Sequence, residues 1–240
     1  MSYLILSDIH GNLEALDAVL ADARGLYDRI LCLGDLVGYG ADPNAIVAWA
    51  RENVRTIVRG NHDKVCSGLE SADTYNPAAQ ASALWTQSEL IPTHRDYLER
   101  MPRGPLPYEG LDLVHGSPAV EDEYLLSVFQ LPALVPFIQS QITFFGHTHI
   151  QGGFLLTPRA SRPLTPRVAL NIEPDYFYLV NPGSVGQPRD GDPRAAYALY
   201  SPEGRAVEFR RVAYDVDRAA AKIRAAGLPE FLAARLHEGA

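Results

Sequence analysis

The chain has 240 residues, of which 47% are hydrophobic and 21% are charged. This composition is typical of a globular protein and excludes a disordered or fibrous chain, and the length suits one large domain or at most two small ones. The formal net charge is −8. Because an acidic surface repels the phosphate backbone, we expect no binding of long nucleic acids.

The sequence offers neither an export signal nor a membrane span. The first apolar run, residues 3–6, is too short for a signal peptide and has no basic flank. No apolar stretch approaches the roughly 20 residues that a membrane span needs. The two cysteines, Cys32 and Cys66, cannot build a disulfide framework, and the apolar run around Cys32 indicates a buried thiol. We therefore expect a soluble cytoplasmic protein that does not enter membranes.

The first part of the chain alternates short apolar runs with amphipathic segments, which is typical of an α/β layered domain. Strands are expected over residues 3–6, 30–33 and 56–58. Between them, apolar residues at spacings of three and four predict a helix over 13–23, with Asn12 at its N-cap. The pair Asp42-Pro43 predicts a capped helix that continues to residue 53.

The pattern changes between residues 64 and 108. Helices are expected from Asn76-Pro77 and over 93–101, followed by an irregular proline-rich segment over 102–107. We interpret 64–108 as a helical insertion over one end of the sheet, near the active-site edge. Further on, we expect strands over 111–114 and 142–145, with a helix over 131–139 between them.

After residue 152 the chain is rich in strand patterns. Strands are expected over 153–156, 168–172, 176–180, 195–200 and 206–212. The proline- and arginine-rich stretch 157–167 is expected to be a loop. Helices over 215–226 and 230–237 end the sequence. There is no internal repeat and no linker, so residues 1–240 are expected to form a single domain.

Polar clusters follow the expected strands, and most of the histidines lie in them. Five of the seven histidines come directly after a strand: His10, His62, His115, His147 and His149. Parallel strands bring their carboxyl ends to one edge of a sheet, where ligands bind. A lone histidine at a strand end is more often structural than a ligand. Repetition of imidazole, carboxylate and amide groups at successive strand ends instead indicates a metal site.

The candidate metal ligands are two carboxylates, four imidazoles and one amide. They are Asp8, Asp35, His10, His115, His147, His149 and Asn61. The absence of a thiolate disfavours a structural zinc site or an iron–sulfur cluster, and mixed nitrogen and oxygen donors suit Mn²⁺, Fe²⁺, Zn²⁺ or Ni²⁺. Seven ligands exceed what one ion needs, whereas two ions about 4 Å apart that share a carboxylate would use them all. Such a pair activates a bridging hydroxide that attacks a phosphoryl group.

Five ordered blocks resemble the signature motifs of the calcineurin-like metallophosphoesterases. The blocks are Asp8-x-His10, Gly34-Asp35, Gly60-Asn61-His62-Asp63, His115-Gly116 and Gly146-His147-x-His149. Residues 181–189 are also similar to a later segment of small bacterial and archaeal members. The resemblance implies an α/β fold in which a two-sheet sandwich is flanked by helices, the four-layer αββα arrangement. It also implies a dinuclear site at one sheet edge.

The resemblance assigns the ligands position by position. One ion would be held by Asp8, His10 and His149. The other would be held by Asn61, His115 and His147, with Asp35 bridging the two. His62 matches the family's histidine that faces the scissile group, where it would stabilise the transition state or protonate the leaving oxygen. The alternative for His62 is a hydrogen-bonding residue behind the ligands.

One departure from the family pattern narrows the expected function. The phosphoprotein phosphatases of this superfamily continue Gly-Asp-x-x with Asp-Arg-Gly, whereas this chain has Gly38 and Tyr39 in place of the aspartate and the arginine. Asp63 is a candidate to replace the aspartate that orients the catalytic histidine. Arg189 is a candidate to replace the phosphate-binding arginine, because a guanidinium matches phosphate geometry. A solvated loop arginine is the alternative at position 189.

Asn12 is a second candidate for substrate binding, since its amide could donate to a phosphate oxygen. A helix cap is the favoured interpretation of this residue.

We therefore expect a metal-dependent phosphoesterase that hydrolyses small phosphodiesters. It would use two divalent metal ions, with Mn²⁺ ahead of Fe²⁺, Zn²⁺ or Ni²⁺, and a small-molecule phosphoester substrate. The alternatives are a phosphomonoesterase or protein phosphatase, a nuclease for short oligonucleotides, and a non-catalytic metal-binding scaffold for protein interactions. The complete ligand set and His62 favour an enzyme over the scaffold.

Overall fold

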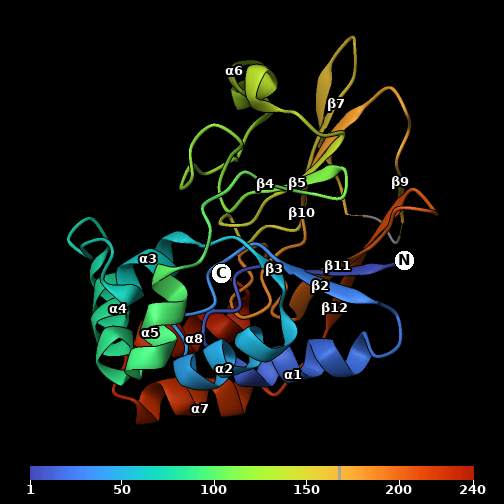
Figure 1. Cartoon of the computed structure of the whole chain (residues 1–240). Coiled ribbons are helices and arrows are strands. Elements are labelled where there is room, and N and C mark those ends of the chain that lie inside the picture. The colour runs from blue at the N-terminus through green and yellow to red at the C-terminus, as the bar shows by residue number, and fades with distance from the viewer. Residues whose placement is uncertain (167–168) are drawn as a thin grey trace.

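Two six-stranded mixed sheets pack face to face in the computed structural model, which describes residues 1–166 and 169–240 (Figure 1). The first sheet has the order β3-β2-β1-β11-β12-β9. Its strands are β1 (Tyr3–Leu6), β2 (Arg29–Cys32), β3 (Thr56–Ile57), β9 (Leu170–Asn171), β11 (Ala195–Ser201) and β12 (Ala206–Val212).

The second sheet has the order β4-β5-β6-β10-β7-β8. Its strands are β4 (Leu106–Tyr108), β5 (Leu111–Leu113), β6 (Ile142–Phe144), β7 (Gly152–Leu156), β8 (Ser161–Leu164) and β10 (Phe177–Asn181). Within the first sheet β1, β2 and β3 are parallel, and within the second β5, β6 and β10 are parallel. Each sheet therefore gathers the carboxyl ends of several strands at one edge.

Helices cover both outer faces of the sandwich, most of them on the side of the first sheet (Figure 1). On that side lie α1 (Leu13–Asp22), α2 (Pro43–Asn53), α3 (Asn61–Ser67), α4 (Pro77–Glu89), α5 (Pro92–Glu99), α7 (Val216–Ala225) and α8 (Glu230–Glu238). The short helix α6 (Leu131–Leu134) lies beyond the second sheet. The expected two-sheet sandwich flanked by helices is confirmed.

Successive side chains along each strand point to opposite faces of the sheet, and this alternation divides the core into layers. On β1, Tyr3 and Ile5 point between the two sheets and pack with residues such as Phe144. Leu4 and Leu6 point the other way, into the cluster that α1 and α2 cover. This is the two-residue period of a strand that is buried on both faces. The thiols of Cys32 and Cys66 are both free and buried, as expected for Cys32.

Most expected elements are present within a residue or two, and the differences have local causes. The expected loop over 157–167 contains β8, an exposed edge strand whose one partner among the described strands is β7. The expected helix over 131–139 is wrong in extent, because the chain forms only α6 with a 3-10 turn on each side. The expected strand over 168–172 is β9 in part, and residues 167 and 168 lie outside the described part of the chain.

Three of the expected helix caps can be compared with the structure. Asn12 and Asn76 each accept a hydrogen bond from a backbone N–H three residues on, as predicted. Asp42 makes no such bond, and its carboxylate instead pairs with Lys222 at 2.7 Å. The expected cap at Asp42 is therefore wrong, because an ion pair to α7 takes up the side chain.

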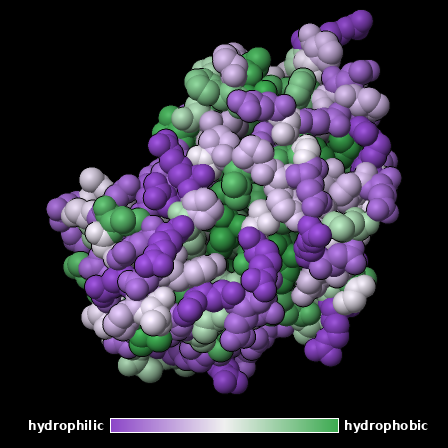
Figure 2. Space-filling model, in the orientation of Figure 1, coloured by the Kyte–Doolittle hydropathy of each residue, from purple (hydrophilic) through white to green (hydrophobic). Residues whose placement is uncertain are grey.

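The face of the molecule in Figure 2 is largely hydrophilic, and its outline is indented between the α3–α4 layer and the part of the chain that carries α6. No helix in the described part of the chain is long and apolar enough to cross a membrane.

Candidate metal centre

The expected ligands lie on the turns that follow the parallel strands of both sheets. Those from the first sheet are Asp8 and His10 after β1, Asp35 after β2, and Asn61 after β3. Those from the second sheet are His115 after β5, and His147 and His149 after β6. The carboxylates and imidazoles among them are buried. The structure therefore brings these side chains together at the sheet edge, as the strand pattern predicts.

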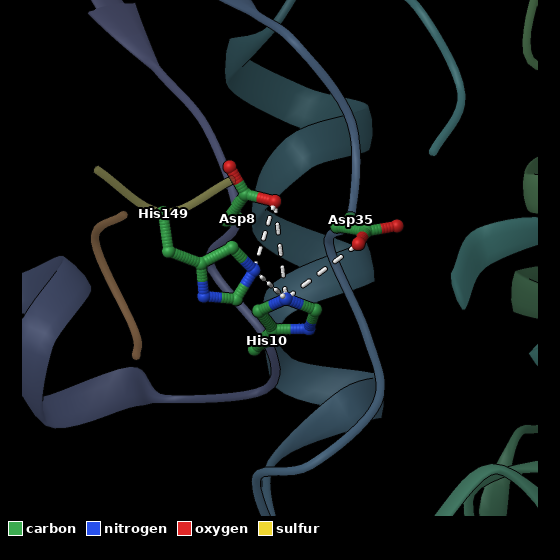
Figure 3. Close-up of side chains that lie close together, drawn as sticks. All are labelled: Asp8, His10, Asp35 and His149. Atoms are coloured by element: carbon green, nitrogen blue, oxygen red, sulfur yellow. Dashed lines mark hydrogen bonds and ion pairs between the residues drawn. The ribbon is translucent and has the colours of Figure 1, made fainter. Parts of the chain in front are cut away.

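Four of these residues form one tight group (Figure 3). The ring Nε2 of His10 lies 3.5 Å from Asp35 Oδ2 and 3.1 Å from His149 Nε2. His149 Nε2 in turn lies 3.3 Å from Asp8 Oδ1. One ligand atom from each of the four residues lies within 4.8 Å of the others, a spacing that one metal ion can bridge.

A second group shares Asp35 with the first. His115 Nε2 lies 3.4 Å from Asp35 Oδ2 and 3.1 Å from His147 Nδ1. Its distance to Asn61 Oδ1 is also 3.1 Å. Since Asp35 belongs to both groups, the geometry has the form of two adjacent sites with a common carboxylate.

Main-chain carbonyls fix the orientation of three imidazoles. The Nδ1–H groups of His10, His115 and His149 donate to the carbonyl oxygens of Val37, Leu33 and Gln187 at 2.9, 2.8 and 2.6 Å. In a neutral ring this leaves the Nε2 lone pair pointing at the centre, which is the arrangement of a metal-binding histidine.

Two oxygen donors also point into the centre. Asn61 donates through Nδ2 to the Tyr75 hydroxyl at 2.6 Å, so its Oδ1 faces His115. Asp8 accepts from Ser7 and His147 through Oδ2, whereas its buried Oδ1 has no hydrogen-bond partner. A buried oxygen without a partner is costly, and a bound cation would satisfy it. The residues therefore fit divalent ions.

Burial and mutual charge set the protonation of the centre. Burial lowers the pKa of His10 and His149, and it lowers the pKa of His147 to about 3. Burial alone would also lower the pKa of His115, but the charge of Asp35 raises it to about 10. For Asp35, burial opposes ionisation, yet His115 and the other imidazoles hold its pKa well below the usual range. Apart from His115, the imidazoles are thus neutral near pH 7.

The turns that carry the ligands adopt an uncommon backbone conformation. Positive φ angles occur at five of the ligand positions, namely Asp8 (54°), His10 (48°), Asp35 (53°), His147 (65°) and His149 (59°). The left-handed region costs a residue other than glycine about 1–2 kcal/mol. Strain of this kind clusters at functional sites, where the surrounding structure must enforce it.

Asp63 enforces one of these turns. Its carboxylate accepts from the backbone N–H groups of Asp35 and Gly60 at 2.7 and 2.9 Å, and from that of Leu36 at 2.9 Å. Burial and the nearby Asp35 raise the pKa of Asp63 to about 7. The suggestion that Asp63 orients His62 is wrong, because its oxygens are occupied by the backbone of the Asp35 turn.

Comparison with known proteins identifies the family. Residues 1–205 match the model of the calcineurin-like phosphoesterase superfamily domain. The chain belongs to this superfamily. The match covers all the turns that carry the candidate ligands, and it ends before β12, α7 and α8.

Three similar proteins match this chain over nearly its whole length and nearly all of their own. An uncharacterized protein of Methanocaldococcus jannaschii is 36% identical over 242 residues, which cover 98% of this chain and 97% of the relative. The crystal structure of a metallophosphoesterase from Sphaerobacter thermophilus matches with a TM-score of 0.88 at 39% identity, covering 100% and 99% of the two chains. A hypothetical protein from Pyrococcus horikoshii shares the fold with a TM-score of 0.81 at 21% identity, covering 100% and 98%.

His62 lies beside the candidate ligands. Its backbone N–H donates to Asp35 Oδ1 at 2.8 Å, and its ring packs 5.0 Å from that of His10 and 4.4 Å from that of Tyr39. The ring Nδ1 is buried without a partner. A Cβ added to Gly38 would lie 2.5 Å from this nitrogen. The glycine therefore makes room for the imidazole, and no side chain fits at position 38 unless the ring moves.

A cleft of about 340 Å³ opens in front of His62. Asn61, His62 and His147 form part of its lining, along with the tyrosine rings at 39, 75 and 124. The ring of Tyr124 stacks on His147 with a centroid distance of 3.8 Å. Sequence reasoning missed Tyr75, whose position depends on how the segment between α3 and α4 folds back over the centre.

The two weaker substrate-binding candidates lie in different surroundings. Asn12 accepts from Ala15 N and donates to the carbonyl of Gly186 at 2.9 Å, so its amide is already used within the fold. This geometry supports the helix cap rather than a substrate contact. Arg189 donates from its backbone to the His149 carbonyl, and its guanidinium carbon lies 5.6 Å from the centre of the Tyr39 ring. Arg189 therefore lies next to the centre.

Proposed function

We propose that this protein hydrolyses small phosphodiesters with two divalent metal ions. Asp8, His10 and His149 would hold one ion, and Asn61, His115 and His147 the other. Asp35 would bridge them. The single observation that supports this most strongly is the convergence of inward-facing ring nitrogens and carboxylate oxygens in two groups that share Asp35. When bound, the ions would supply an activated bridging hydroxide and neutralise the charge that develops on the phosphoryl oxygens.

The protein's own side chains would bind and orient the ester. His62 lines the cleft beside Asp35 and can donate a hydrogen bond to the phosphoryl group or to the leaving oxygen. Arg189 lies over Tyr39, and its planar guanidinium suits the oxygens of a phosphoryl group.

The shape of the cleft favours diesters over monoesters. A diester carries a second esterified group, which needs space beside the reacting phosphorus. Tyr39, Tyr75 and Tyr124 line such a space with uncharged rings, which suit a planar or apolar group. Tyr39 also replaces the arginine that phosphoprotein phosphatases use for a phosphate group.

The test is a steady-state assay of metal-stripped protein. Mn²⁺, Ni²⁺, Zn²⁺ and Mg²⁺ are supplied in turn with bis(p-nitrophenyl) phosphate or p-nitrophenyl phosphate. We expect metal-dependent turnover that prefers the diester, and a loss of at least about 100-fold in kcat for Asp35→Asn and His62→Ala. Asp17→Asn, at an exposed position of α1, is the matched control and should keep full activity.

Two results would contradict the proposal. A clear preference for the monoester would assign a phosphomonoesterase. A wild-type protein that binds two ions but turns over neither ester would favour the non-catalytic scaffold.

A further inference from the structure

The hydroxyl of Tyr75 contacts the candidate metal centre from the segment between α3 and α4, outside the turns that carry the ligands. It accepts a hydrogen bond from Asn61 Nδ2 at 2.6 Å, and the amide oxygen of the same Asn61 lies 3.1 Å from His115 Nε2. The Tyr75 ring also packs against that of His62, with 4.9 Å between the ring centroids. Tyr75 is thus in contact with a candidate ligand and with the histidine that lines the cleft.

The proton of this hydroxyl is available for a further contact. A tyrosine hydroxyl both accepts and donates, and the bond from Asn61 uses only its acceptor side. Among the described residues none accepts the proton of Tyr75. Tyr75, Asn61 and His62 all line the cleft of about 340 Å³, and the bond between Tyr75 and Asn61 is only partly buried. A group bound in the cleft can therefore accept the hydrogen bond that Tyr75 has left to donate.

The surrounding chain holds Tyr75 in place. Its backbone N–H donates to the Ala72 carbonyl at 3.0 Å, and the next residue, Asn76, caps α4 by accepting from Ala79 N at 3.0 Å. The ring packs against the cluster that α1 and α2 cover and against the one that contains Tyr39. The donor is therefore positioned before an ester binds, which is the condition under which a hydrogen bond contributes most to stabilising a transition state.

The hydrogen-bond donors of this cleft are uncharged. No lysine or arginine belongs to its described lining, and Arg189 lies outside that lining, over the Tyr39 ring. Ser71 and Asn76 also line the cleft, but their side-chain oxygens accept from backbone N–H groups of their own segment. In the described lining Tyr75 is therefore the donor of this segment that is bonded to a candidate ligand.

We propose that Tyr75 is a catalytic residue whose hydroxyl donates a hydrogen bond to a non-bridging phosphoryl oxygen of the ester. The assignment rests on the proposed function and adds a donor from outside the five sequence blocks. In phosphoryl transfer the attacking and leaving oxygens are in line, and charge develops on the equatorial oxygens. A donor that adjoins a candidate ligand lies beside those equatorial oxygens, and its bond strengthens as the charge develops.

Removal of the hydroxyl alone tests this contact. Tyr75→Phe keeps the ring beside His62, and it is assayed on bis(p-nitrophenyl) phosphate over a range of Mn²⁺ concentrations up to saturation. We expect kcat/KM at saturating Mn²⁺ to be about 10- to 100-fold below that of the wild type, because a hydrogen bond to a charged acceptor is lost. Recovery of the wild-type value at saturating Mn²⁺ would show that Tyr75 acts only by supporting Asn61, and would overturn the proposal.

Tyr97→Phe is the matched control. Tyr97 of α5 is also a partly buried tyrosine that packs against the cluster covered by α1 and α2, but it is not part of the described cleft lining. We expect this variant to keep the kcat/KM of the wild type.

The leaving group identifies the oxygen that accepts the bond. Methyl p-nitrophenyl phosphate and methyl phenyl phosphate differ in the basicity of the departing oxygen. A donor to a non-bridging oxygen predicts the same fold-loss for Tyr75→Phe on both esters. A clearly larger loss on the phenyl ester would place the bond on the leaving oxygen and contradict the assignment.

A binding experiment measures the contact without turnover. The Mn²⁺-loaded protein is titrated with inorganic phosphate in a calorimeter. We expect Tyr75→Phe to bind phosphate at least about 10-fold more weakly than the wild type, and Tyr97→Phe to bind it equally well.

The experiments separate failure of the Tyr75 contact from failure of the proposed function. Phosphate binding that depends on the hydroxyl, in a protein that hydrolyses no diester, would support the contact and contradict the phosphodiesterase. Diester hydrolysis and phosphate affinity that are both unchanged in Tyr75→Phe would overturn the contact while supporting the phosphodiesterase.

Discussion

His10 and His149 face each other with their Nε2 atoms 3.1 Å apart, although each ring donates its other nitrogen to a main-chain carbonyl. Two neutral imidazoles in this orientation oppose lone pair to lone pair, which is unfavourable unless a cation lies between them. Asp8 Oδ1, which lacks a hydrogen-bond partner, lies 3.3 Å from His149 Nε2. The fold thus holds the two rings and the carboxylate in an arrangement that becomes favourable when a positive charge lies between them.

Metal binding should release about one proton near pH 7, because a bound imidazole must be neutral. The released proton comes from His115, whose pKa Asp35 raises to about 10 despite burial. His62 and His147, with pKa values of about 4 and 3, contribute none between about pH 6 and 8. Calorimetric titration with Mn²⁺ in buffers of different ionisation enthalpy measures the number. Asp63, whose pKa of about 7 is raised by burial and by Asp35, adds a fraction of a proton. His115→Gln should therefore release clearly less than the wild type, and equal release by the two proteins would contradict the assignment.

Gly38→Ala should reduce catalysis through His62. The new Cβ would lie 2.5 Å from His62 Nδ1, so the ring must move. We expect kcat to fall at least about 10-fold at unchanged metal content, because His62 lines the cleft beside Asp35. Gly25→Ala is the control, since Gly25 also has a positive φ (77°) but nothing within 4 Å.

Both glycine variants should lose about 1–2 kcal/mol of unfolding free energy from the left-handed backbone alone. Thermal denaturation measures this shared cost. Equal activity of the two variants would show that position 38 does not control His62.

Asp63→Asn should weaken both the fold and metal binding. The carboxylate accepts three backbone N–H groups around the Asp35 turn, whereas an amide has one acceptor oxygen and places its own N–H groups against the remaining donors. We expect a loss of about 1–3 kcal/mol in unfolding free energy and about 10- to 100-fold in metal affinity. Denaturant unfolding and metal titration measure these losses, with the exposed Asp175→Asn as control. Unchanged metal affinity in a destabilised variant would limit Asp63 to a structural role.

Lys64→Met should loosen the segment that carries Tyr124. The buried ammonium of Lys64 lies 2.5 Å from Asp122, 3.0 Å from Glu70 and 3.6 Å from Glu121. Removing the cation takes away the partner of Asp122 and Glu70, which are 37% and 50% exposed, whereas Glu121 keeps Arg59 at 2.7 Å. We therefore expect a cost of about 1–3 kcal/mol. We expect a lower Tm and a raised KM, because Asp122 and Tyr124 line the cleft.

Arg103→Met is the matched control for this network. Arg103 also reaches Glu121, at 3.6 Å, but its side chain is 64% exposed. Exposed pairs contribute about 0–1 kcal/mol, so Tm and KM should stay near the wild-type values. Equal effects of the two variants would contradict a specific role for Lys64.

Elements with a strong local signal could be predicted from the sequence, and elements defined by their neighbours could not. The helix α1 follows from apolar residues at spacings of three and four and from its cap, Asn12. Helix α3 has only seven residues and begins inside the polar cluster at Asn61. Its sequence therefore lacks the apolar residues at spacings of three and four that would predict a helix. Strand β8 is exposed and contains Pro163, and only its pairing with β7 defines it.

The same distinction applies to the site. The ligands of one turn are close in sequence, as Asp8 and His10 are, so their pattern is visible before the fold is known. Tyr75 reaches His62 only because of how the segment between α3 and α4 folds back over the centre. No local pattern identifies it, since it is an ordinary tyrosine in its own segment.

The candidate ligands are divided between the two sheets. The packing of the core between the sheets therefore sets the distance between ligands that come from different sheets. The separation of His10 from His147 depends on how far apart the sheets are held by interior side chains, for example by Phe144 of β6 against Tyr200 of β11, whose ring centroids are 5.6 Å apart. A change in the volume of such a residue would alter the distance between the two groups of candidate ligands, although the residue touches none of them. In this architecture the spacing of the candidate ligands depends on the thickness of the apolar layer between the two sheets.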